Sequence, residues 1–163
     1  MAHLFNNELT VRGKPQDIAA FKLKAGKDVP HEEPSPLHFH NFVPAPNDLL
    51  NQVGPEMTKS RIDWEDENWG CNWGAIECKL SPGKDDSEAI YYFETGWRPP
   101  TIFLYKVAQM HPELLFILDT DCFKAGSQYY VTFWRDYYKI DDCTWITSAQ
   151  CHCICGATNG NRK

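Results

Sequence analysis

The chain has 163 residues, of which 42% are hydrophobic and 23% charged, and its formal net charge is −6 at pH 7. This length and balance are typical of one folded domain and exclude a disordered or fibrous chain. The negative charge repels phosphate at long range, so it disfavours sequence-independent binding to nucleic acid or to an anionic membrane surface.

Two further classes are disfavoured by the absence of targeting signals. No apolar run approaches the ~20 residues that span a bilayer, so we expect no membrane association. The first residues, MAHLFNN, lack the basic start and apolar core of a secretion signal. We therefore expect a cytoplasmic protein whose seven cysteines remain reduced thiols.

The first half of the chain predicts strand, helix and strand. Residues 9–11 have β character, and Pro15 suits the first turn of a helix over residues 15–24. A polar, proline-rich loop follows, after which the apolar-rich residues 37–43 predict a second strand. Residues 48–61 carry only a weak helical pattern.

The second half predicts a hairpin, a helix and two more strands. Runs at 75–80 and 89–93 flank a turn-forming segment, so they should pair antiparallel. Residues 114–118 are all apolar, as expected of an interior strand covered on both faces, and residues 129–134 are aromatic and β-branched. Between these strands, residues 100–110 predict a helix with one apolar stripe, formed by Phe103, Leu104, Val107 and Ala108.

Helices separated by antiparallel strands predict an α+β domain of two layers, with the helices packed on one face of the sheet. We expect this domain to occupy residues 1–140. Residues 141–163 predict a cysteine-rich C-terminal extension that ends in a frayed tail, because its last residues have nothing to bury.

Several sequence phrases, taken in order, resemble a known family. They are NN and TVRG within residues 6–13, FVPAP at 42–46, NWGCNW at 68–73, FETGWRPP at 93–100 and PELLF at 112–116. Together they resemble the YubB ferredoxin-like domain family, small proteins of phages and plasmids whose function is unknown. The resemblance covers residues 4 to 135. It implies a ferredoxin-like antiparallel sheet and an origin in a mobile element, but no activity.

The most distinctive side chains are three tryptophans. Trp69 and Trp73 are four residues apart, a spacing that puts both on one face of a helix or of a strand. Trp97 follows the neighbouring predicted strand, and Arg98 could lay its guanidinium on an indole. The functional interpretation is a binding patch, and the alternative is a structural corner that caps the core. The predicted patch consists of Asn68, Trp69, Trp73, Thr95, Trp97 and Arg98.

Two clusters have the residue types of a metal site without a complete ligand set. His38 and His40 would share one face of the predicted strand, with His31, Glu32 and Glu33 in the preceding loop, and we expect a solvated polar face there. Near the C-terminus, an extended chain spaces three cysteines too widely for one zinc ion, although a fourth could join two of them after a chain reversal. These residues are Cys143, Cys151, Cys153 and Cys155. We predict no metal and no other cofactor, and leave a partial cysteine site open.

The sequence lacks a nucleophile elbow, a phosphate-binding glycine loop and a metalloprotease motif, so we expect no enzyme. The leading hypothesis is a mobile-element accessory protein that acts as a non-catalytic binding module and inhibits a host protein such as a defence factor. The alternative is a nucleic-acid-binding module that stacks bases on aromatic residues of the sheet, although the usual basic-aromatic phrase is absent. Its candidate residues are Tyr91, Phe93, Tyr129 and Phe133. An exposed apolar patch with an acidic rim would favour the protein partner.

Overall fold

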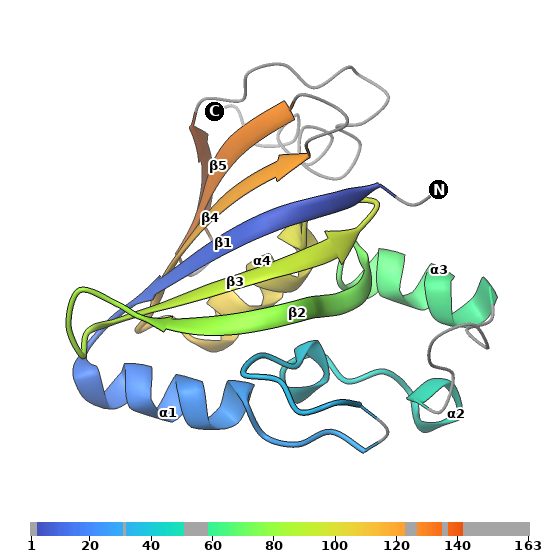
Figure 1. The fold of residues 1–163 in the computed structure, drawn as a ribbon, viewed down its shortest axis with the longest axis horizontal. Helices are drawn as coiled ribbons and strands as arrows, with labels where there is room; N and C mark the ends of the chain where they lie inside the picture. Colours follow the sequence, from blue (N-terminus) through green and yellow to red (C-terminus); the bar gives the residue numbers. More distant parts are fainter. Residues whose placement is uncertain (1–2, 31, 51–58, 123–126, 135–136, 142–163) are drawn as a thin grey trace.

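The computed structural model describes residues 3–30, 32–50, 59–122, 127–134 and 137–141. Within them, six strands form one antiparallel sheet in the order β2-β3-β1-β4-β5-β6 (Figure 1). The strands are β1 (Leu4–Arg12), β2 (Asn72–Pro82), β3 (Glu88–Gly96), β4 (Leu115–Cys122), β5 (Ser127–Trp134) and β6 (Tyr137–Asp141).

The helical segments lie in the two long connections of the sheet. Between β1 and β2 the chain forms α1 (Pro15–Ala25), the 3-10 turn η1 (Phe39–Asn41), α2 (Asn47–Leu50) and α3 (Lys59–Asn68). Between β3 and β4 it forms α4 (Thr101–Met110). None of the described helices has both the length and the hydrophobicity of a transmembrane segment.

The strand order identifies the topology. Each helical connection joins two strands that run in the same direction and leave room for a third strand between them, which gives the order β2-β3-β1-β4 of the ferredoxin-like fold. The predicted α+β class and ferredoxin-like sheet are therefore confirmed. Strands β5 and β6 continue the sheet beyond β4.

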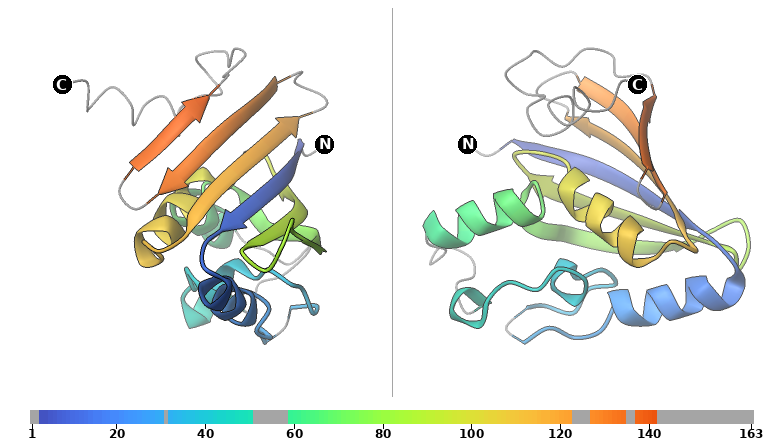
Figure 2. Two further views of the ribbon diagram at one scale, coloured as in Figure 1. Left: turned by 90° about the vertical axis from the view of Figure 1, so that its left-hand side faces the viewer. Right: turned by 180° about the vertical axis from the view of Figure 1, so that it is seen from behind.

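The core lies on one face of the sheet, under α1 and α4 (Figure 2). Phe21 of α1 packs edge-on against Tyr91 of β3, and Phe103 of α4 stacks on Phe39 with ring centroids 3.8 Å apart. Alternate residues of three strands complete this core, namely Leu9, Val11, Ala89, Tyr91, Phe93, Phe116 and Leu118. The opposite face, called the outer face below, carries none of the described helices (Figure 2).

The strand predicted at residues 37–43 is wrong. Residues 39–41 form a 3-10 turn, and four consecutive side chains, Leu37, His38, Phe39 and His40, are all buried. A strand packed on one face buries only alternate residues. Here Leu37 and Phe39 enter the core, and the imidazoles of His38 and His40 contact charged side chains outside it. The alternation of apolar and polar residues therefore does not come from a strand.

The other predicted elements are largely confirmed, with one difference in burial. The helices over 15–24 and 100–110, the hairpin, and the interior position of β4 all appear in the structure. Leu115 and Ile117 are only half-buried, however, because they lie on the outer face, so the prediction that both faces of this strand are covered is wrong. Residues 48–61 are described only in part, and the predicted C-terminal extension lies outside the described residues.

Candidate binding site

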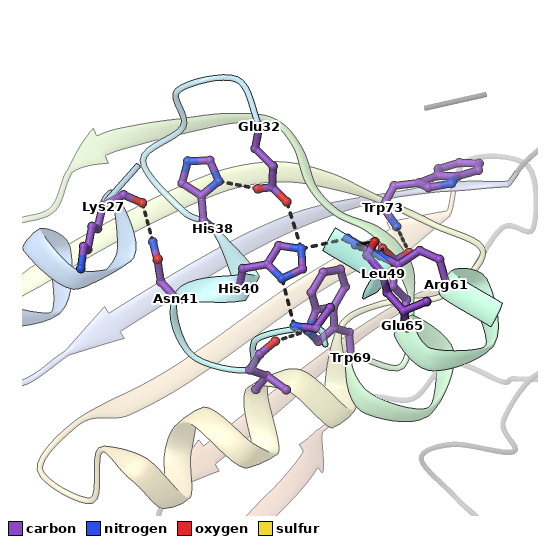
Figure 3. Close-up of polar contacts among 12 residues, drawn as sticks. Lys27, Glu32, His38, His40, Asn41, Leu49, Arg61, Glu65, Trp69 and Trp73 are labelled. Carbon is purple, nitrogen blue, oxygen red and sulfur yellow. Dashed lines mark hydrogen bonds and ion pairs between the residues drawn. The ribbon is translucent and has the colours of Figure 1, made fainter. Parts of the chain in front are cut away.

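A buried ion pair of α3 lies at the centre of the site (Figure 3). Arg61 Nε lies 2.6 Å from Glu65 Oε1, and the two side chains are only 3% and 0% exposed. Arg61 Nη1 donates to the carbonyl of Leu49 at 2.7 Å, and Nη2 faces His40 Nε2 at 2.8 Å. A buried guanidinium is tolerated only when its donors are matched in this way. The pair therefore fixes α3 against the loop that carries His40.

Glu32 links two histidines to this pair. Its Oε2 lies 2.8 Å from His38 Nδ1 and its Oε1 lies 3.0 Å from His40 Nε2. His40 Nδ1 accepts the backbone N–H of Ala45 at 3.2 Å, and its Nε2 lies between Glu32 Oε1 and Arg61 Nη2. The predicted solvated face is therefore wrong, because a carboxylate of the preceding loop makes burial of both imidazoles favourable.

The two carboxylates of this network have opposite pKa shifts. Burial would raise the pKa of Glu32, but hydrogen bonds and charge interactions with His40 and His38 outweigh it and lower the pKa. At Glu65 burial dominates and raises the pKa, although the Trp73 N–H and Arg61 act in the other direction. Glu32 is therefore ionised at neutral pH, and it carries negative charge at the surface of the site, where it is 26% exposed.

Among the described residues, no group of three or more His, Cys, Asp or Glu is arranged to hold a metal ion. The contact between Arg61 and His40 gives a physical reason at this place. A guanidinium 2.8 Å from His40 Nε2 would repel a cation bound to that nitrogen. The terminal cysteines lie outside the described residues.

A cleft of about 950 Å³ opens between the network and the edge strand β2. Its apolar floor includes Leu37, Phe39 and Trp69, and residues 74–79 of β2 form one wall. The lining also contains six charged residues, namely Glu32, Glu33, Arg61, Glu65, Glu77 and Lys79.

Trp69 and Trp73 do not share a face. Trp69 is 1% exposed, and its indole N–H donates to the carbonyl of Val43 at 3.0 Å. Trp73 is 40% exposed. Their spacing of four does not put them on one face, because the chain passes from helix to strand between them. It does so through the left-handed conformation of Gly70 at φ 79°, so neither regular period continues. Rings of three residues surround Trp69, namely Phe39, His40 and Trp64.

Three exposed apolar residues adjoin Gly96 and are called the exposed corner below, namely Leu4, Trp73 and Trp97. Leu4 pairs with Gly96 in the sheet, and a Cβ added to Gly96 would approach the Trp73 ring to 2.6 Å, so the indole lies against this glycine. Trp97 follows directly, and its backbone N–H donates to the carbonyl of His3 at 2.7 Å. The three apolar side chains are 42%, 40% and 47% exposed, respectively.

The three polar residues predicted for the site make internal contacts. Asn68 donates to the backbone of α3 and accepts a hydrogen bond from a lysine of α4. Thr95 is fully buried, and its hydroxyl donates to the carbonyl of Arg98 at 2.8 Å. The Arg98 guanidinium pairs with Asp66 at 3.0 Å and not with an indole, which corrects the expected stacking.

The aromatic residues proposed for nucleic-acid stacking are not available where they are described. Tyr91 and Phe93 are 0% and 4% exposed and face the helices, while the side chains of Tyr129 and Phe133 lie outside the description. The charged residues that the register places on the outer face of β1, β3 and β4 are mainly acidic, and this arrangement disfavours phosphate binding. They are Glu8, Glu88, Glu94, Asp119 and Asp121, against one basic residue, Arg12.

Sequence reasoning missed the importance of Leu4, Arg61 and Glu65. The i, i+4 spacing of Arg61 and Glu65 indicates a pair on a helix, but it does not show that the pair is buried. Leu4 joins the exposed corner only through strand register, which no local pattern reveals.

No protein-family model and no curated protein matches the sequence. Among solved structures, the chain is similar to the crystal structure of protein api92 from Yersinia pseudotuberculosis, of family DUF1281. The TM-score is 0.65 at 6% identity, and the match covers 90% of this chain and 100% of that chain. This similarity supports the fold and a structural relation to a protein of a domain-of-unknown-function family. The finer resemblance to the YubB family stays a prediction.

Proposed function

We propose that the chain is a non-catalytic binding module that docks on a protein partner through the exposed corner of Leu4, Trp73 and Trp97. The observation that carries this proposal is the combination of exposure and backbone strain at both indoles. Trp73 and Trp97 have φ angles of 70° and 67°, and Glu77 is the only other described non-glycine residue with a positive φ.

A bulky residue rarely adopts this conformation, because its Cβ approaches the following carbonyl oxygen at a cost of roughly 1–2 kcal/mol. An exposed indole also leaves apolar surface in water. Strain of this kind is concentrated at functional sites, where the surrounding structure enforces it. Here the Trp73 N–H donates to Glu65 Oε2 at 2.9 Å, so the buried network holds the strained backbone in place.

The surroundings of the corner suggest the chemistry of the partner. Glu94 lies on the outer face two residues before Gly96, and Asp121 accepts a hydrogen bond from Asn6, which is two residues after Leu4. An apolar patch with an acidic rim suits a protein surface that presents apolar residues bordered by lysine or arginine. A phosphate backbone has the opposite charge requirement.

The resemblance to a family of phage and plasmid proteins supplies a finer proposal. The partner would be a protein of the host cell, such as a defence factor, that is inhibited by occupancy. A module that acts in this way needs a stable surface and no catalytic residues.

The test begins with capture of partners from host lysate by the tagged protein, with and without nuclease. For a protein that is captured and then purified, dissociation constants are measured for the native chain, Trp73→Ala, Trp97→Ala and the control Leu23→Ser. Leu23 is 81% exposed on α1 and lies outside the corner. Loss of an anchor residue should weaken binding by about 30-fold, whereas the control should bind normally. Unchanged affinity in both tryptophan variants, or capture that nuclease abolishes, would contradict the proposal.

A further inference from the structure

We infer that the cleft beside β2 receives an arginine side chain of the partner that docks at the exposed corner. The inference rests on the proposed function and specifies the chemistry that the partner must carry.

The side chains that line the cleft carry a net negative charge, which favours binding of a cation. Glu33 and Glu77 are exposed carboxylates, and Glu32 is ionised and partly exposed. Arg61 is the buried basic group of the lining, and its three nitrogens already face Glu65, Leu49 and His40. Lys79, the other basic residue of the lining, is exposed. Negative charge therefore exceeds positive charge in the lining, and a bound guanidinium would balance it.

The backbone of β2 is irregular at residues that line the cleft. Glu77 has φ 48°, and the pairing of β2 with β3 shifts register between Ile76 and Lys79. A β-bulge of this kind redirects a side chain at a cost in backbone strain. Glu77, the residue at this irregularity, belongs to the cleft lining.

The cleft also offers accessible apolar surface. Gly74, Trp69 and Phe39 are buried, but two apolar residues of the lining are not, because Ala75 is half-buried and Pro34 is exposed. The methylene groups of an arginine can pack there while its charged end stays near the carboxylates.

Trp73 connects the cleft to the exposed corner. It lines the cleft, and its indole lies against Gly96, around which the corner is built. A partner segment seated on the corner would therefore lie beside the cleft at this shared residue. Arginine suits this place better than lysine, because a planar guanidinium both stacks on an indole and forms paired hydrogen bonds with a carboxylate.

The test needs no identified partner. Amide signals of the native chain are followed by NMR during titration with N-acetyl-arginine methylamide, and separately with the lysine and norleucine analogues. We expect saturable shifts confined to residues 32–33 and 73–79, tightest binding for arginine and none for norleucine. The double variant Glu33→Gln/Glu77→Gln should bind at least about fivefold more weakly, because two partly exposed ion pairs are lost.

The control is the double variant Asp85→Asn/Asp86→Asn in the turn between β2 and β3. It removes the same charge outside the cleft lining. No shifts with arginine, equal binding of norleucine, or equal weakening in the control would overturn the inference. This outcome is separate from failure of the proposed function, which is decided by the affinity of Trp73→Ala and Trp97→Ala for the partner.

Discussion

Truncation of Trp69 and of Trp73 should have opposite consequences for folding and binding. Trp69 is 1% exposed and surrounded by aromatic rings, whereas Trp73 is 40% exposed. We predict that Trp69→Ala destabilises the domain severely, and that Trp73→Ala leaves it folded but impairs partner binding. The two residues lie in one short phrase of sequence, so each serves as the control for the other.

The expected magnitudes follow from the environment of each indole. Removal of a fully buried Trp costs ~3–5 kcal/mol through the cavity that it leaves. The carbonyl of Val43 also loses the indole N–H that lies 3.0 Å away, which adds roughly 1 kcal/mol. For Trp73→Ala we expect a loss of only about 1 kcal/mol, because the side chain is already partly solvated.

Urea unfolding followed by circular dichroism measures both values without relying on tryptophan emission. A loss of ~4–6 kcal/mol would consume much of the 5–15 kcal/mol that is typical of a domain, so Trp69→Phe provides a milder variant that should still fold. Trp73→Gly tests the backbone argument, because glycine adopts φ near 70° without strain and should recover stability relative to Trp73→Ala. If Trp69→Ala lost less than about 2 kcal/mol, or if Trp73→Ala lost as much, the assignment of one indole to the core and the other to the surface would be refuted.

Other consequences follow from the buried polar groups. Glu65→Gln should lower the free energy of unfolding in urea by ~3–5 kcal/mol, because Arg61 would remain buried without a charged partner. A loss no larger than that caused by neutralising an exposed carboxylate would contradict this. The pKa of Glu32 is lowered from its ordinary value of 4.5. Ionised Glu32 therefore stabilises the folded state above pH 4.5, and this stabilisation is lost as the pH falls through the lower pKa of the folded state. The stability of Glu32→Gln should depend less on acid pH than that of the native chain. The buried hydroxyl of Tyr91 has no hydrogen-bond partner among the described residues, so Tyr91→Phe should be neutral or stabilising by up to ~1 kcal/mol in thermal unfolding. Burial raises the pKa of Cys78 to about 12, so iodoacetamide at pH 8 should modify it far more slowly in the native protein than in urea.

The elements that sequence predicts correctly are those in which one periodic pattern extends over the whole segment. In α4 each residue of the predicted apolar stripe is buried, namely Phe103, Leu104, Val107 and Ala108. The hairpin of β2 and β3 is equally local, since turn residues separate two strands that pair with each other. Strand β6 was not anticipated, because its pairing with β5 rests on register and not on a strong pattern of its own.

The errors occur where several contacts from distant parts of the chain act together. Residues 37–43 have a β composition, but the burial of their two histidines depends on distant partners. These are Glu32 in the preceding loop and Arg61, which lies more than twenty residues after the start of the 3-10 turn. No periodicity contains this information. The spacing of Trp69 and Trp73 failed for the related reason that a left-handed glycine changes the chain direction between them. Polar partners and special backbone angles, rather than hydrophobic pattern, determine these positions.

The Arg61–Glu65 pair is better explained by positioning than by stability. A buried ion pair contributes little net free energy, because desolvation opposes the attraction, and apolar residues of similar volume often serve as well. Glu65, however, uses Oε1 for Arg61 and Oε2 for the N–H of Trp73. An apolar residue could not hold that strained backbone. The carboxylate therefore connects the cleft to the exposed indole, and a double replacement of Arg61 and Glu65 by apolar residues should preserve folding while Trp73 loses its fixed orientation.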